Sequence, residues 1–418
     1  MSTQTADRTR KNFKISFGFY LLFKIIFWPF VRIYNIRAEL TESARNLNGP
    51  YLVLSNHIGF WDPFLVSYFL KKKPHFISSD AVMRDPVKGF FIKGFGAIPK
   101  KKNIRDTKVI RDMAAYIAAG ESLGLFPEAT RTWTGNTLFI DPSIAKLVKL
   151  LNVPVVSARM KGMFLFNPRW SYKVRKGRVV IDYDVIIQAD EIQQLNQEEI
   201  YERIRKALRH SETEYQLKER IRIKSNRRAE YMNHVLYYCP VCQSFDGYRA
   251  RNNTLTCTNC GSQIQVDRYG FLCQSDSSLP YKSIDQAFAV QNKAFEAFVK
   301  SALEKNRDTC LFAEDNMNIF QTSGSDDFKL LGNGRIEFYP DRILVKIRQR
   351  DDEVLYLENI DTLNAQLYER IEMFSSQRVY RFAGAEKGVS GIRWEIAANI
   401  VWRHTGQAYK ASKYFDPF

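Results

Sequence analysis

The chain has 418 residues, of which 62 are Lys or Arg and 45 are Asp or Glu, so its formal net charge is +17. This length excludes a single small domain and predicts two or three domains. The positive charge, together with an aromatic content of 14%, favours an anionic partner surface. Bilayer headgroups and nucleic acid both fit that description, and composition alone does not choose between them.

Residues 15–31 form an almost wholly apolar and aromatic segment, interrupted by Lys24 and Pro29. Seventeen residues with an internal lysine are marginal for spanning a bilayer core of ~30 Å. Aromatic helices edged with cations suit the membrane interface, so we expect a monotopic anchor within residues 1–37. A helix buried against the protein's own core is the alternative. A secretory signal peptide is not expected, because no small-residue cleavage site follows. The flanking cations are Arg8, Arg10, Lys11, Lys14, Arg32 and Arg37.

Residues 38–190 alternate between strand-like and helix-like patterns. Short apolar runs at 51–54, 123–126 and 153–156 predict buried strands, and residues 106–119 carry apolar side chains at helical spacing. This alternation predicts an α/β domain with a mostly buried sheet. Residues that follow the strands are then expected to converge on one rim of the sheet.

Residues 56–63 read Asn-His-Ile-Gly-Phe-Trp-Asp-Pro and place His57 five positions before Asp62. A neutral imidazole can take a proton from an alcohol near pH 7, and a carboxylate on its other nitrogen fixes the tautomer. The pair therefore suits a hydroxyl that attacks an acyl group. By spacing alone, a structural histidine remains the favoured interpretation.

Three further segments accompany this motif: Gly-Ala-Ile-Pro-Lys-Lys-Lys at 96–102, Phe-Pro-Glu-Ala-Thr-Arg at 126–131 and Val-Pro-Val-Val at 153–156. In this order and at these distances, the four segments resemble the blocks of the glycerolipid acyltransferase family, whose members include 1-acylglycerol-3-phosphate acyltransferases. The resemblance covers roughly residues 12–190.

The resemblance implies a role for each matching residue. His57 would be the general base and Asp62 would orient it, with the hydroxyl attacking a thioester directly and no covalent acyl-enzyme. The acceptor would be held by further residues, and the 153–156 run would shape the floor of the site. A plain surface ion pair between Glu128 and Arg131 and a solvated lysine run at 100–102 stay open as alternatives. The implied acceptor-binding residues are Lys102, Glu128, Thr130 and Arg131.

Three positions depart from the family pattern. Ala129 stands where the family has glycine, which would force a local change if that position needs a positive φ. Gly59 stands where serine is common, and lysines replace the usual residues of the second block. None of these departures touches His57 or Asp62, so the chemistry is expected to be intact.

Residues 191–235 read as a helical connector. An amphipathic helix is expected over 191–208, and a basic run follows at 218–228. The run is interpreted as a solvated connecting helix, with contact to anionic lipid as the alternative.

Residues 236–275 contain two Cys-x-x-Cys knuckles separated by fourteen residues. This spacing lets four thiolates surround one zinc ion tetrahedrally, as in a zinc ribbon. Four sulfur ligands leave no position for water, so the zinc is expected to be structural. Free thiolates fit a reducing compartment. Cys273 and Cys310 lack partners at ligand spacing and are expected to be buried. The four ligands are Cys239, Cys242, Cys257 and Cys260.

The C-terminal part divides into a helical linker at 276–323, with a helix over 283–305, and a β-rich domain at 324–418. Short alternating strands followed by a helix at 391–404 resemble pleckstrin-homology-like or GRAM-like domains, a likeness of topology without a motif. The expected strands are 335–339, 343–347, 354–357, 365–368, 371–374 and 379–382.

The expected protein is thus a peripheral enzyme on the cytoplasmic face of a membrane. It would move a fatty acyl group from acyl-CoA or acyl carrier protein to a lysophospholipid, foremost 1-acylglycerol-3-phosphate, giving phosphatidic acid. No nucleic-acid partner is expected. Two alternatives stay open: a catalytically inactive lipid-surface scaffold, and a nucleic-acid-linked protein that uses the ribbon and the basic helices.

Overall fold

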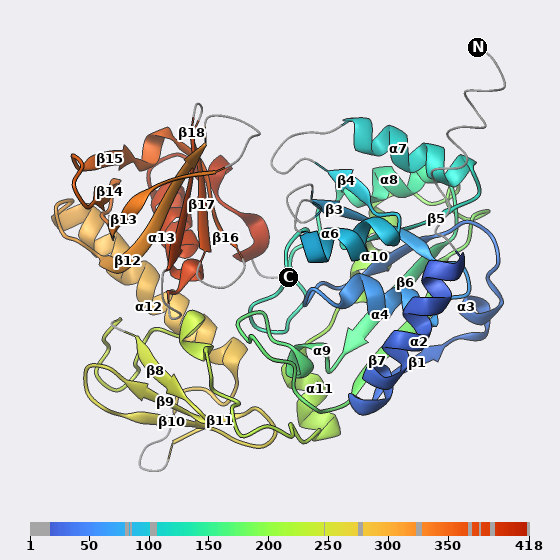
Figure 1. Ribbon diagram of the computed structural model, residues 1–418, viewed down its shortest axis with the longest axis horizontal. Coiled ribbons are helices and arrows are strands. Elements are labelled where there is room, and N and C mark those ends of the chain that lie inside the picture. Colours follow the sequence, from blue (N-terminus) through green and yellow to red (C-terminus); the bar gives the residue numbers. More distant parts are fainter. Residues whose placement is uncertain are drawn as a thin grey trace. The chain divides into compact units, whose positions relative to one another are not determined.

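A computed structural model describes residues 17–79, 83, 86–100, 107–245, 247–274, 279–322, 328–366, 370–375, 378–384 and 389–415. The chain divides into two compact units (Figure 1). The first contains residues up to 168 together with 175–221, and the second contains 169–174 together with 222–415. Each unit is described by itself.

The first unit is built on a seven-stranded sheet in the order β1-β7-β6-β2-β5-β3-β4. All neighbouring strands are parallel except β6 and β7. The central strand β2 is buried along its whole length, as expected when helices cover both faces of a parallel sheet. The predicted α/β domain is therefore confirmed. The strands are β1 (Ile36–Leu40), β2 (Leu52–Ser55), β3 (Pro74–Ser79), β4 (Ile98–Lys100), β5 (Ser122–Leu125), β6 (Val155–Lys161) and β7 (Val179–Ile187).

One hydrophobic core joins β2, β5 and β6 to the helices α7, α8 and α10. Helix α10 begins at Gln197 rather than at 191, because Asn196 and Glu199 form a reciprocal capping box that fixes the first turn. The helices are α2 (Phe17–Ile33), α3 (Glu42–Asn46), α4 (Asp62–Phe69), α6 (Pro86–Gly94), α7 (Thr107–Ala118), α8 (Ser143–Leu151), α9 (Met163–Phe166), α10 (Gln197–Leu208) and α11 (Glu212–Glu219).

Helix α2 packs one face against the first unit and leaves the other face open. Tyr20 and Phe23 are buried in an aromatic cluster with Phe64, Ile92 and Phe95. The alternative of packing against the protein's own core therefore holds for one face of the helix, while the other face presents apolar side chains and the membrane anchor stays a prediction. Within the described residues, every helix is too short or too polar to cross a bilayer.

The second unit begins with a four-stranded antiparallel sheet that carries the cysteine knuckles, in the order β11-β10-β9-β8. A 3-10 turn, η1 (Met232–His234), precedes it, and the helix α12 (Ile284–Lys305) follows it, as predicted. The strands are β8 (Tyr248–Arg251), β9 (Thr254–Cys257), β10 (Gln263–Val266) and β11 (Leu272–Cys273).

The C-terminal β-rich region is one antiparallel sheet in the order β15-β14-β13-β12-β18-β17-β16, covered by helix α13. Trp394 and Trp402 of α13 are fully buried. The elements are β12 (Phe312–Thr322), β13 (Lys329–Phe338), β14 (Arg342–Ile347), β15 (Glu353–Tyr356), η2 (Leu357–Asn359), β16 (Ile360–Ala365), β17 (Arg370–Ser375), β18 (Arg378–Gly384), α13 (Gly391–His404), η3 (Ala408–Lys410) and η4 (Lys413–Phe415).

Two strands differ from the prediction. The residue pattern does not predict β12, because the polar run at 314–316 interrupts its alternation, and the strand accommodates that run with a bulge and a positive φ at Asn316. The strand expected at 365–368 overlaps β16 only at Ala365, where β16 ends, and residues 367–369 lie outside the described part.

The expectation of a connecting helix over 218–228 is wrong. Helix α11 ends at Glu219, since Arg220 adopts a left-handed conformation with φ of 49°, and the chain is irregular up to 228. The expectation that Cys273 and Cys310 are buried is also wrong, because both are exposed. Cys273 lies in the two-residue strand β11, and Cys310 lies in the loop before β12.

Candidate active site

His57 and Asp62 meet at the carboxyl end of the central strand β2. The distance from His57 Nδ1 to Asp62 Oδ2 is 2.7 Å. Asp62 is fully buried, while the His57 side chain is 22% exposed. Because Nδ1 is engaged by the carboxylate, proton transfer falls to Nε2, on the side of the ring away from Asp62.

The carboxylate of Asp62 also shapes the loop between β2 and α4. It accepts hydrogen bonds from the backbone N–H of Ile58 (2.6 Å) and of Gly59 (2.9 and 3.0 Å). Asp62 is the first residue of α4 and Pro63 is the second. A carboxylate and a proline both favour the first turn of a helix, so the local sequence supports this geometry.

A segment after β5, residues 126–132, lies against His57. The ring of Phe126 stacks on the imidazole with centroids 4.2 Å apart. Glu128 Oε1 accepts the His57 N–H at 3.0 Å, and Oε2 accepts the Leu138 N–H at 2.8 Å. Burial raises the pKa of Glu128 to about 8, against the lowering effect of its two backbone hydrogen bonds. Residues 71 positions apart thus form one site, because β2 and β5 are neighbouring parallel strands.

The other predicted site residues do not all lie at the His57 end of the sheet. Thr130 and Arg131 follow β5 and are half-buried at the same end of the sheet as His57. The 153–156 run lies at the start of β6, where Val155 is opposite Leu52, so it lines the end of the sheet away from His57. Lys102 lies outside the described residues.

The two departures from the family pattern that the structure describes have different consequences. Ala129 has a φ of 57°, a left-handed conformation that favours glycine. Gly59 has room for a side chain, since a Cβ there would meet Asn167 Oδ1 at 3.6 Å, an ordinary contact. Alanine therefore strains the backbone at position 129, whereas glycine at position 59 causes no strain.

The four knuckle cysteines form a cluster in the second unit, with sulfurs within 4.8 Å of one another. Cys239 and Cys260 Sγ are 3.8 Å apart, and Cys242 and Cys257 Sγ are 3.7 Å apart. A tetrahedron of ~2.3 Å zinc–sulfur bonds has sulfur–sulfur edges of about 3.8 Å. Hydrogen bonds with Ser262 lower the pKa of Cys260 to about 6, which favours the thiolate, whereas burial raises the pKa of Cys257 to about 12. The donor set therefore fits one metal ion.

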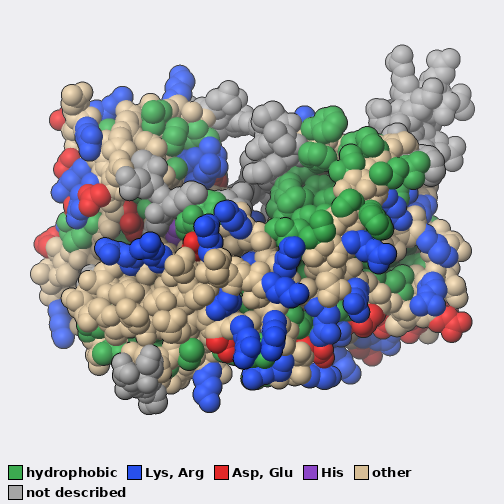
Figure 2. Space-filling view, turned by 60° about the horizontal axis from the view of Figure 1, so that its bottom comes forward, with side chains coloured by type: hydrophobic (Ala, Val, Ile, Leu, Met, Phe, Trp, Pro, Cys, Tyr) green, Lys and Arg blue, Asp and Glu red, His purple; other side chains and the backbone are tan. Residues whose placement is uncertain are grey.

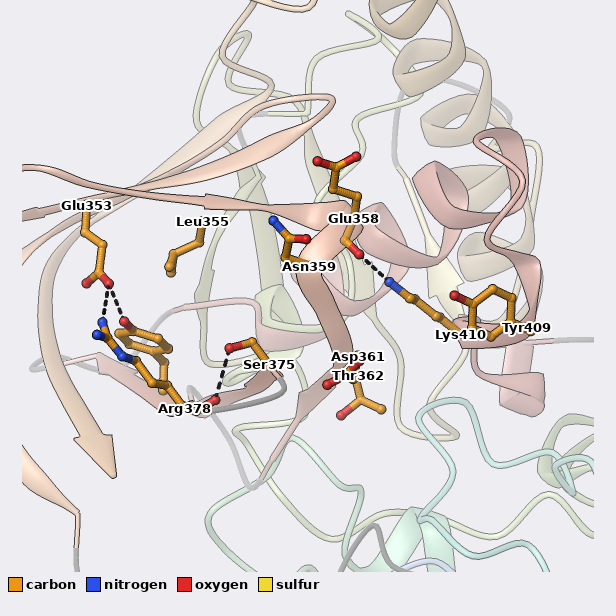
Figure 3. Close-up of a pocket in the computed structure, with 11 residues that line it drawn as sticks. Glu353, Leu355, Glu358, Asn359, Asp361, Thr362, Ser375, Arg378, Tyr409 and Lys410 are labelled. Carbon is orange, nitrogen blue, oxygen red and sulfur yellow. Dashed lines mark hydrogen bonds and ion pairs between the residues drawn. The ribbon is translucent and has the colours of Figure 1, made fainter. Parts of the chain in front are cut away.

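A cavity of about 690 Å³ lies in the C-terminal β-rich region (Figure 3). Two of its charged residues pair with each other, since Arg378 lies 3.4 Å from Glu353, and Lys410 Nζ donates to the backbone carbonyl of Glu358. None of the residues that line it belongs to the His57 site. The lining residues are Glu353, Leu355, Glu358, Asn359, Asp361, Thr362, Ser375, Arg378, Tyr380, Tyr409 and Lys410.

A buried carboxylate in contact with a partly exposed histidine at the end of a parallel strand is an arrangement that can serve general-base catalysis. Residues 35–161 match the family model described as Acyltransferase. The resemblance to glycerolipid acyltransferases drawn from the sequence is therefore confirmed for this part of the chain.

Three solved structures resemble parts of the chain. The 1-acyl-sn-glycerophosphate (LPA) acyltransferase PlsC of Thermotoga maritima is 17% identical over 49% of this chain and 79% of its own, with a TM-score of 0.40. The N-terminal PH domain of human ARAP2 is 18% identical over 22% and 82%, with a TM-score of 0.18. A chain of the 8S snRNP assembly intermediate is 6% identical over 26% and 87%, with a TM-score of 0.16. No curated protein sequence matches the chain.

Proposed function

We propose that the protein is a peripheral membrane acyltransferase that moves a fatty acyl group from a thioester to the free hydroxyl of a lysophospholipid. The observation that carries the proposal is the 2.7 Å contact between His57 and Asp62 inside the region that matches the acyltransferase family. The proposed acceptor is 1-acylglycerol-3-phosphate, which would give phosphatidic acid. The proposed donor is acyl-CoA or acyl carrier protein, and both are acidic partners for a chain of charge +17.

The chemistry follows from the geometry of the pair. His57 Nε2 takes the proton of the acceptor hydroxyl while its oxygen attacks the thioester carbonyl. The tetrahedral intermediate then collapses, the carbon–sulfur bond breaks, and the histidine returns the proton to the departing thiolate. The buried carboxylate of Asp62 stabilises the imidazolium between these two steps. General-base catalysis of this kind contributes about 10²- to 10⁴-fold in rate.

The acceptor phosphate is proposed to lie against Arg131. Arg131 is half-buried and follows β5 at the His57 end of the sheet, and a planar guanidinium fork matches phosphate oxygens better than a point charge does. Thr130 would add a hydroxyl contact. Lys102 keeps its proposed phosphate contact on the resemblance alone.

Peripheral attachment through α2 and α6 is part of the proposal. Six large apolar side chains of α2 and two of α6 are at least 43% exposed. Figure 2 shows hydrophobic side chains gathered on one face of the first unit, with Lys and Arg beside them. Both helices lack acidic residues, and Lys24, Arg32 and Lys93 supply cations. An apolar, aromatic and cationic surface fits an anionic bilayer. The exposed side chains are Leu21, Leu22, Ile25, Ile26, Trp28, Ile33, Phe90 and Phe91.

The cysteine cluster is proposed to hold a structural zinc ion, with the four thiolates as its complete ligand set. Bound zinc would supply folding energy to the β8–β11 sheet and no chemistry at His57. Cysteines that act as thiolate ligands rather than forming disulfides fit a reducing compartment, which supports the proposed placement on the cytoplasmic face of the membrane.

An inactive scaffold is the second candidate, and the positive φ of Ala129 favours it, because strain beside the acceptor residues would weaken substrate binding. A scaffold would bind lipid vesicles, and His57→Ala would change nothing that can be measured.

The deciding experiment measures phosphatidic acid formed from labelled acyl donor and lysophosphatidic acid, with acyl-CoA and acyl carrier protein offered separately. We expect product from the wild type, and at least a hundredfold less from folded His57→Ala. His404→Ala, a half-exposed histidine of the second unit, is the matched control and should keep full activity. Equal turnover by the wild type and His57→Ala would overturn the proposal. A panel of other lysolipids separates a different acceptor from an inactive scaffold.

A further inference from the structure

Residues 126–132 contact His57 at three points. The Phe126 ring covers the imidazole, Glu128 Oε1 accepts the His57 N–H, and the Thr132 N–H donates to the His57 carbonyl at 3.0 Å. The ring and both backbone polar groups of one residue are thus held by a single segment from the neighbouring strand end.

Glu128 is the buried centre of this arrangement. It is 1% exposed, and each of its two oxygens is engaged by a backbone N–H, from His57 and from Leu138. A carboxyl group whose two oxygens are both engaged by backbone donors and which is removed from solvent has no surface to offer a lysolipid. Thr130 and Arg131, two and three residues later, are half-buried and reach the surface instead.

Three consecutive N–H groups of the loop are held by two buried carboxylates. The His57 N–H donates to Glu128, and the N–H groups of Ile58 and Gly59 donate to Asp62. The contact between Asp62 and His57 Nδ1 fixes the orientation of the imidazole ring only when the backbone of His57 is itself fixed. A shift of about 1 Å in a reacting group can reduce the rate by about 10²-fold.

We infer that Glu128 is a positioning residue, which fixes the His57 backbone between β2 and β5, and is not a ligand of the acceptor. This inference deepens the proposed function and rests on it for the kinetic readout. Glu128 moves no proton in the reaction and acts only through the place it gives His57.

The test compares Glu128→Gln with the wild type in two measurements. In kinetics, we expect kcat to fall by about 10- to 100-fold, with the KM for the lysophospholipid changed less than about twofold. In hydrogen exchange, we expect the amides of His57 and Leu138 to exchange faster, because an amide NH2 group cannot accept one of the two N–H donors. The exchange readout needs no turnover, so it tests the inference even if the acyl transfer proposal fails.

Glu212→Gln is the matched control. Glu212 is also a buried acid of the first unit, 3% exposed, and accepts a backbone N–H from Gly162 at 3.0 Å, away from His57. We expect it to leave exchange at His57 unchanged. If Glu128→Gln does not fold, Glu128→Asp keeps the carboxyl group but shortens its reach, and the same two amides should lose protection.

Two outcomes would overturn the inference. The first is a Glu128→Gln protein whose KM for the acceptor rises tenfold or more while kcat is kept, which is the signature of a ligand. The second is unchanged hydrogen exchange at both amides, which would show that the carboxylate does not hold the loop.

Discussion

The ring centroid of Trp61 lies 5.2 Å from that of Phe30 in α2, and Trp61 is the residue directly before Asp62. Phe27 of the same helix lies 5.8 Å from the same ring. The apolar helix α2 and the residue that precedes Asp62 therefore share one aromatic cluster. If α2 binds to a lipid surface, the His57 site would also lie near its lipid acceptor.

The exposed face of α2 gives the first prediction. Replacing Ile25 and Ile26, each 63% exposed, by Glu should lower binding to anionic vesicles at least tenfold, because each buried isoleucine contributes about 1.5–3 kcal/mol and the new charges are repelled. Vesicle co-sedimentation measures this. Leu150→Glu on α8, 58% exposed, is the control and should bind like the wild type. Unchanged binding by the double variant would remove α2 from the membrane surface.

Asp62 gives the second prediction. Asp62→Asn keeps the size of the side chain but loses the charge that stabilises the imidazolium and can select the wrong tautomer of His57. We expect kcat to fall by about 10²-fold or more with a folded protein. Steady-state kinetics over a range of pH measures it. A variant with wild-type kcat would show that the 2.7 Å contact is structural only.

Ala129 gives the third prediction. Ala129→Gly removes the Cβ from a residue with φ of 57° and should raise the free energy of unfolding by about 1 kcal/mol. Chemical denaturation measures the change. Ala114→Gly, inside α7, is the control of opposite sign and should lower the free energy by about 0.5–1 kcal/mol. If both variants are destabilised, the backbone at 129 is not strained.

The cysteine cluster gives the fourth prediction. The purified protein should contain about one zinc ion per chain, since four thiolates complete one tetrahedral site. Cys242→Ser should lose the zinc and lower the unfolding temperature of the second unit. Cys273→Ser, an exposed cysteine outside the cluster, should keep both. Metal analysis and calorimetry measure these quantities, and a zinc-free protein with an unchanged melting curve would contradict the expectation.

His234 gives the fifth prediction. It is fully buried, and neither ring nitrogen has a hydrogen-bond partner among the described residues. Burial lowers its pKa from 6.5 to about 4. The unfolded chain therefore binds this proton more readily than the folded protein, so stability is present above pH 6.5 and is lost as the pH falls toward 4. The full loss is about 3 kcal/mol.

Denaturation curves at pH 7 and pH 4.5 measure this effect. His234→Phe should shrink the difference between the two pH values. An identical pH dependence in the wild type and His234→Phe would assign the acid sensitivity to other groups.

The sequence alone determined the features written in contiguous residues. The helical periods of α7, α12 and α13, the alternating strands β14 and β17 and the knuckle spacing all follow from local side-chain pattern. The His57–Asp62 pair also lies within one short loop, where five positions of chain decide the contact. The side-chain pattern did not predict β12, because a bulge interrupts that strand. It also did not predict the exposure of Cys273, which lies in an edge strand.

Only the tertiary structure decided which distant residues share a site. Glu128 meets His57 across 71 positions because β5 lies beside β2, and no local period records which strands are neighbours. The parallel pairing of β6 with β2 also separates the 153–156 run from the site, because parallel strands bring their starting residues to the end of the sheet opposite His57. Burial likewise depends on the neighbours a residue meets in space, which is why Glu128 is enclosed while Arg131, three residues later, reaches the surface.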